Sequence, residues 1–130
     1  MAKMLFREPN EVRWVGTRPA HRGTQVVKDG SAANATTLLY TVTAAKTLYL
    51  TGYWIEKQFT AANCELSFYI RNAGDVLWYR LIRHIQAVAA TLAISRSFSF
   101  PLEVPAGYDL ILYSSAVGGI IYGGFEGWEE

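Results

Sequence analysis

Two stretches of the chain, residues 38–56 and 102–130, alternate strand-forming residues with short turn signals. Both are dense in Thr, Tyr, Val, Ile and Leu, and both are broken by Gly or by Pro-Ala-Gly. β-Branched and aromatic residues separated by such turns favour antiparallel sheet. The same stretches hold few residue types that perform chemistry. They therefore predict a protein that works through its shape and its surface.

The pattern continues through the rest of the chain after residue 23. We expect strands at residues 24–28, 36–43, 47–56, 64–71, 76–85, 94–100, 108–114 and 120–128, with turns at 29–31, 44–46, 72–75 and 105–107. About eight strands at intervals of roughly ten residues are typical of an all-β fold, and they predict an antiparallel jelly-roll β-sandwich over residues 24–130. For residues 86–93 the sequence leaves open a short helical turn and a connection without helix.

Alternation within the predicted strands assigns side chains to faces, because successive side chains of a strand point to opposite sides. In residues 47–56, one face receives Leu48, Leu50, Gly52 and Trp54, and the other receives Tyr49, Thr51, Tyr53 and Ile55. In residues 94–100, Phe98 and Phe100 are expected to point inward. Cys64 shares a face with Leu66 and is expected to be a buried thiol.

Residues 1–23 differ from the rest because Pro and Gly interrupt every period and Arg alternates with apolar residues. We predict an extended N-terminal arm here. A Trp in a basic arm favours packing onto another subunit or protein, although an arm folded back over its own sandwich remains an alternative. The candidate partner-binding residues are Arg7, Arg13, Trp14, Arg18 and Arg22.

The composition indicates that another chain covers part of the surface. Charged residues make up 18% of the chain, against about 25% in typical globular proteins, while aromatic residues reach 14%. Aromatic side chains suit subunit contacts and also stack against sugar rings. The candidates for an oligomer interface or a ligand site are Tyr49, Tyr53, Trp54, Tyr122 and Trp128.

Charge and hydropathy argue against nucleic acid and membrane as partners. The formal net charge of +1 argues against a dedicated nucleic-acid-binding protein, which usually has a concentrated basic face. No stretch approaches the roughly 20 apolar residues of a membrane span, and the first residues do not read as a signal peptide. We expect a soluble protein made in a cytoplasm, with no membrane partner.

The sequence contains no recognisable catalytic or metal-binding motif. Its one cysteine excludes an intrachain disulfide, and His21 and His84 lack nearby ligand-type companions. There is no Gly-x-Ser-x-Gly motif, and the carboxylates fall at strand ends, turns or outward positions. We therefore expect no enzyme activity, no metal and no cofactor.

Four segments taken in order carry a family resemblance: TVTAAKTLYLTGYWI (41–55), NAGDVLWYRL (72–81), SRSFSFPLEVPAGYDLILYSSA (95–116) and GFEGWEE (124–130). Over about residues 36–130 they resemble small phage virion-associated jelly-roll proteins of the head-decoration or fibre-tip type. The chain departs from that pattern at Ala44-Ala45-Lys46, where Pro-Ala-Gly-Lys is more usual, in the segment QAVAATLAI and at Trp128.

The resemblance implies a structural virion protein, a capsid decoration or cement protein that binds the major capsid protein or another virion protein. It also implies a homotrimer, with glycine-lined strands around the trimer axis and the basic arm reaching neighbouring capsid subunits. The alternative is a receptor-binding tip of a head or tail fibre that recognises host surface glycans. A weaker third possibility is a non-viral trimeric adhesion or signalling module.

Overall fold

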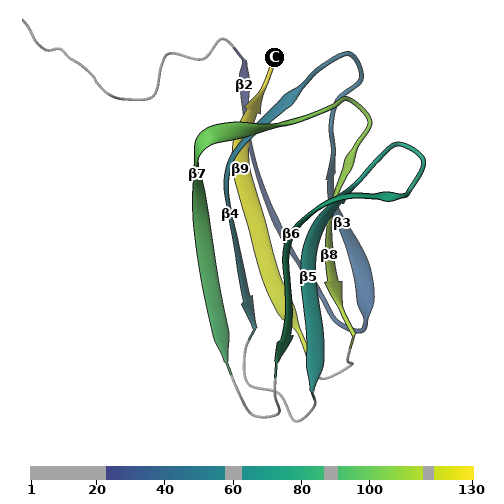
Figure 1. Cartoon of the computed structure of the whole chain (residues 1–130), viewed down its shortest axis with the longest axis vertical. Coiled ribbons are helices and arrows are strands. Elements are labelled where there is room, and N and C mark those ends of the chain that lie inside the picture. The colour runs from purple at the N-terminus through teal and green to yellow at the C-terminus, as the bar shows by residue number, and fades with distance from the viewer. Residues whose placement is uncertain (1–22, 58–62, 87–90, 116–118) are drawn as a thin grey trace, which may run out of the picture.

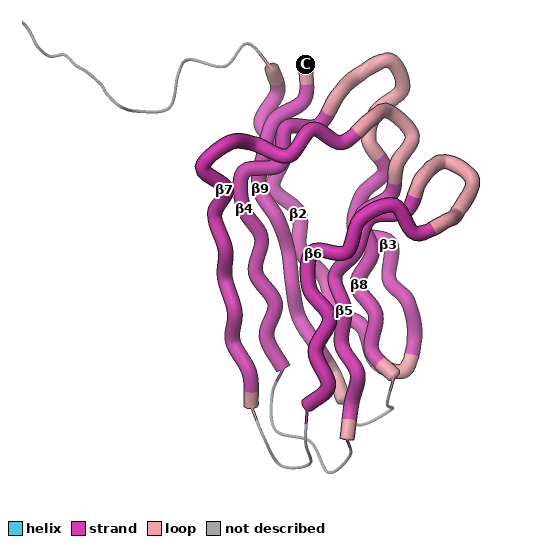
Figure 2. Tube along the Cα trace, viewed as in Figure 1, coloured by secondary structure: helices cyan, strands magenta, loops and turns pink. Residues whose placement is uncertain are grey.

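The computed structural model describes residues 23–57, 63–86, 91–115 and 119–130. These residues are all-β, with eight antiparallel strands in two four-stranded sheets and no helix (Figure 1 and Figure 2). The strands are β2 (Thr24–Ala32), β3 (Ala35–Thr41), β4 (Leu48–Lys57), β5 (Cys64–Arg71), β6 (Leu77–Gln86), β7 (Leu92–Val104), β8 (Asp109–Ser114) and β9 (Ile121–Glu129). The all-β prediction is confirmed, whereas the proposed arm, up to residue 22, lies outside the described residues.

The strand order places sequence neighbours in opposite sheets. One sheet has the order β2-β9-β4-β7 and the other has the order β3-β8-β5-β6. Consecutive strands lie in different sheets, except for β5 and β6, which form a hairpin within one sheet. The turns at residues 42–47, 72–76 and 105–108 lie at one end of the two sheets, with the C-terminus (Figure 2). We call this the hairpin end.

The core lies between the two sheets and is built from alternate residues of the central strands. Fully buried side chains include Leu48, Leu50 and Ile55 from β4, Phe68 from β5 and Phe125 from β9. Burying a large apolar side chain contributes about 1.5–3 kcal/mol, so these strands hold the sheets together. Cys64 is also buried, as expected.

A β-bulge in β4 changes which residues face the core. The pairing of β4 with both β7 and β9 shifts register between Leu50 and Gly52, and an extra residue in one strand reverses the alternation after it. As a result, Tyr53 and Ile55 share the core with Leu48 and Leu50. The predicted face assignment, which separated these two pairs, is wrong from the bulge onward.

Strand β2 runs through the predicted turn at residues 29–31. Asp29, Gly30 and Ser31 pair with Gly124, Gly123 and Tyr122 of β9. Pairing along the full length of β9 therefore overrides the local preference of Asp-Gly for a turn. The chain turns three residues after Ser31, at Asn34, whose φ of 50° is in the left-handed region, which Asn tolerates well.

Phe100 is 86% exposed and does not point inward as predicted. The register of β7 against β4 breaks after Ser97 and resumes at Leu102. Pro101 lies in this interruption, and proline has no N–H to donate to a ladder. Phe98 packs against the core, whereas the break carries Phe100 out to solvent.

The other predicted turns are found in the structure. Ala45 has a φ of 64° and the Lys46 N–H donates to the Thr43 carbonyl at 3.1 Å. Gly107 has a φ of 80°, a conformation that glycine adopts without strain. The sequence left residues 86–93 open as a helical turn or a connection without helix. Residues 87–90 of this segment lie outside the described residues, and β7 begins at Leu92.

Candidate functional site

The structure brings four of the five predicted aromatic residues onto one face. Tyr49, Trp54, Tyr122 and Trp128 all lie on the outer face of the sheet β2-β9-β4-β7. Tyr49 and Trp128 pair directly across strands and stack with ring centroids 5.2 Å apart. The result is an aromatic face on the outside of the sandwich.

Tyr53 does not belong to this face. Its side chain is only 5% exposed, lies edge-on to Phe68 at 5.7 Å and donates a hydrogen bond to the Leu81 carbonyl at 3.1 Å. Burial raises the pKa of its hydroxyl above 10.0. The expectation of an accessible ring at this position is corrected, because the β4 bulge turns it into the core.

A depression of about 390 Å³ lies beside Trp54 on the aromatic face. Asp29, Glu56 and Tyr122 contribute to its lining. Carboxylates and aromatic rings in one depression can accept hydrogen bonds from ligand hydroxyls and offer an apolar surface. This depression could therefore bind a polar ring compound such as a neutral sugar.

The hairpin end carries a run of exposed apolar residues that the assignment of strand residues to two alternating faces did not predict. Val76, Leu77, Trp78 and Tyr79 are consecutive and all exposed, with Val76 reaching 60%. Trp78 packs edge-on against Tyr108, with ring centroids 5.1 Å apart. Runs of four exposed apolar residues are unusual in a soluble protein unless they are functional. The sequence signal was the uninterrupted Val-Leu-Trp-Tyr after the turn.

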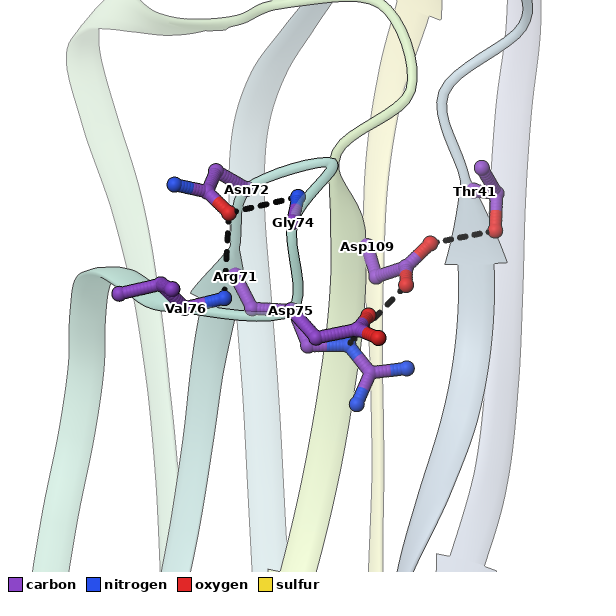
Figure 3. A network of polar contacts seen from close by, with 7 residues as sticks. All are labelled: Thr41, Arg71, Asn72, Gly74, Asp75, Val76 and Asp109. Atoms are coloured by element: carbon purple, nitrogen blue, oxygen red, sulfur yellow. Dashed lines mark hydrogen bonds and ion pairs between the residues drawn. The ribbon is translucent and has the colours of Figure 1, made fainter.

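A polar network fixes the hairpin end next to this run (Figure 3). Arg71 Nε lies 3.0 Å from Asp109 Oδ2 and 3.3 Å from Asp75 Oδ1, and the Thr41 hydroxyl donates to Asp109. Within the hairpin, the Asn72 side-chain oxygen accepts hydrogen bonds from the N–H groups of Gly74 and Val76. These contacts tie β3, β5 and β8 to the start of β6.

The outer face of the second sheet carries a groove of about 400 Å³. Its lining comes from all four strands and the β5–β6 hairpin: Thr36, Glu65, Ser67, Tyr69, Arg71, Asp75, Leu77, Arg80 and Tyr113. At its edge, Arg83 binds Glu65 through two nitrogen atoms at 2.9 and 3.2 Å. The hydrogen bond from Arg83 holds the pKa of Glu65 below 4.5.

Within the described residues, no group of three or more His, Cys, Asp or Glu side chains could hold a metal ion. The same part of the chain includes His84 on β6 but not His21. Searched over these residues, the structure has no helix long and apolar enough to cross a membrane.

The candidate arm residues Arg7, Arg13, Trp14, Arg18 and Arg22 lie outside the described residues. Their predicted role stays a prediction. Comparison of the chain with protein-family models, with curated proteins and with solved structures finds no match.

Proposed function

We propose that this chain is a jelly-roll structural protein of a phage virion, a decoration or cement protein that binds the capsid surface. The strand orders β2-β9-β4-β7 and β3-β8-β5-β6 support the jelly-roll assignment, since a jelly roll has eight strands in two packed sheets. Viral capsid proteins and lectins both use this architecture. The resemblance of residues 36–130 to small virion proteins favours the virion.

One geometric observation carries the proposal: the exposed apolar run and the start of β2 lie at the same end of the molecule. Gly23 lies against Glu129 and Trp128, and the neighbouring backbone of Glu130 exchanges hydrogen bonds with Thr47 at 3.0 and 3.2 Å. This is the hairpin end, where Val76–Tyr79 are exposed. A basic N-terminal segment and an apolar surface at one end suit attachment to a single partner surface.

In this proposal, the capsid partner buries Val76–Tyr79 while residues 1–23 reach over neighbouring capsid subunits through Arg7, Arg13, Trp14, Arg18 and Arg22. Apolar burial contributes roughly 25 cal/mol per Å² before the cost of ordering the segment is subtracted. The aromatic face, with Tyr49, Trp54, Tyr122 and Trp128, would make the homotrimer contact.

Co-sedimentation with heads built from the major capsid protein of the same phage tests the proposal. We expect saturable binding by the full chain and loss of binding by a chain that begins at Thr24, which should keep its β-sheet circular dichroism. The double variant V76S/L77S, in which two exposed apolar side chains of the run are removed, should also bind more weakly. Unchanged binding by the shortened chain would contradict the role of the arm.

Glycan recognition by a fibre tip is the second candidate, and the depression beside Trp54 favours it. It predicts saturable binding to host cells or a glycan array and loss of that binding in W54A. Binding to heads without binding to glycans would support the decoration role and reject glycan recognition.

A further inference from the structure

The groove on the sheet β3-β8-β5-β6 contains one arginine, Arg80, that forms no ion pair with a carboxylate of the described residues. Arg71 pairs with Asp109 and Asp75, and Glu65 pairs with Arg83. Among the described residues, no ion pair forms at Arg80. Arg80 lies close enough to Glu65 to help lower the pKa of that carboxylate, but the carboxylate is already bonded by Arg83. The Arg80 guanidinium therefore keeps N–H donors that no carboxylate of the described residues occupies.

Ser67 holds the Arg80 side chain over the groove. Ser67 lies on the central strand β5 and is only 1% exposed, and its hydroxyl accepts a hydrogen bond from Arg80 Nη1 at 3.2 Å. A guanidinium has five N–H donors in a planar fork, so four remain after this contact. A positioned guanidinium of this kind matches the two oxygens of a carboxylate.

Two tyrosines flank this position. Tyr69 pairs with Arg80 across β5 and β6, and Tyr113 pairs with Ser67 across β8 and β5. Both rings line the groove, and a tyrosine offers an apolar ring together with a hydroxyl. The volume of about 400 Å³ falls within the roughly 300–1,000 Å³ of small-molecule sites.

We infer that this groove binds an acidic saccharide, a sugar that carries a carboxylate as in a sialic or uronic acid. The carboxylate binds the Arg80 guanidinium, and the sugar ring lies against Tyr69 and Tyr113. The inference does not require capsid attachment. It deepens the second candidate function, glycan recognition, and assigns it to a different face from the depression at Trp54.

NMR titration of the isotopically labelled full chain tests the inference. The probes are 3′-sialyllactose and digalacturonic acid as carboxylate sugars, glucose 6-phosphate as a phosphate sugar, and lactose as a neutral sugar. We expect saturable shifts for the two carboxylate sugars, centred on the amides of Tyr69, Arg80 and Tyr113. Lactose should cause no comparable shifts.

Substitution of Arg80 locates the site. Loss of a charge-assisted hydrogen bond is expected to weaken binding roughly tenfold to a hundredfold in R80Q, with R80K intermediate because it keeps the charge but loses the fork. The matched control is R96Q, which removes the same charge from an exposed position on β7 of the other sheet and should leave binding unchanged.

Any of four outcomes would overturn the assignment. These are the absence of a saturable shift with both carboxylate sugars, lactose binding as tight as theirs, binding of the phosphate sugar alone, and an affinity in R80Q equal to that of the parent protein. Binding that is lost in W54A but kept in R80Q would also reject this groove, while leaving glycan recognition in place at the aromatic face.

Discussion

The indole of Trp54 covers Gly124 on the neighbouring strand. A methyl group on Gly124 would lie 2.5 Å from Trp54 Cη2 and 2.5 Å from the Lys28 carbonyl oxygen, closer than real Cβ atoms approach their neighbours. The space left by this glycine is therefore filled by the chain itself. Gly124 is therefore required for packing within this sheet, and the predicted trimer with glycine-lined strands around its axis stays a prediction.

The variant G124A should lose about 1–3 kcal/mol of unfolding free energy, because overpacking forces side chains or backbone to move. Urea unfolding followed by tryptophan fluorescence measures this loss. The matched control is G74A, since the nearest atom to a methyl group there is Asn72 Oδ1 at 3.4 Å. Equal losses in both variants would contradict the close packing at Trp54.

The hydroxyl of Tyr53 should contribute to stability rather than to binding, since it donates to the Leu81 carbonyl across the core. We expect Y53F to lower the unfolding free energy by about 1 kcal/mol without changing the oligomeric state of the protein in solution. Thermal unfolding and light scattering test the two statements. In the exposed control Y122F, stability should be unchanged, and a similar loss there would argue against the buried bond.

Asp109 should matter more than Asp75, although both pair with Arg71. The Asp109 side chain is 13% exposed and that of Asp75 is 72% exposed, and solvent weakens an exposed pair. We expect a loss of about 1–2 kcal/mol for D109N and less than about 0.5 kcal/mol for D75N. Chemical denaturation compares the two, and the reverse order would contradict the geometry in Figure 3.

Glu129 should make stability depend on pH in the acid range. Burial acts to raise its pKa, but hydrogen bonds from the Thr43 N–H and the Tyr40 hydroxyl hold the pKa below 4.5. A lowered pKa in the folded state means that the contribution is complete well above pH 4.5. It is lost as the pH falls through the folded-state value.

The variant E129Q should therefore be less stable than the parent protein by about 1 kcal/mol at pH 7. This difference should shrink as the pH falls below about 4.5. Urea unfolding between pH 3 and pH 7 measures it, with the exposed E126Q as the control. A difference that stays constant across this range would rule out the titration of Glu129 as its cause.

Most of the fold could be predicted from the sequence because strand alternation and turn chemistry are local. The strand Cys64–Arg71 has the predicted bounds, and the turn at Gly107 follows from a conformation that glycine favours. The errors arise where pairing with a distant strand decides the outcome. The bulge near Gly52 depends on β7 and β9, and Asp29–Ser31 follow β9.

The candidate surfaces were harder to predict for the same reason. Tyr49 and Trp128 are 79 residues apart in the sequence, and only the β4–β9 register stacks them. The groove at Arg80 depends on which charges find partners, which a sequence does not reveal. The run Val76–Tyr79, by contrast, was readable as four consecutive apolar residues.

The most direct test of the proposed attachment is hydrogen–deuterium exchange of the full chain, free and mixed with phage heads built from the candidate major capsid protein. Attachment by the hairpin end predicts that binding slows exchange at residues 76–79 and in residues 1–23, while the amides of residues 49–54 and 121–124 change little. Protection confined to those last two segments, or no protection anywhere, would contradict attachment through the hairpin end.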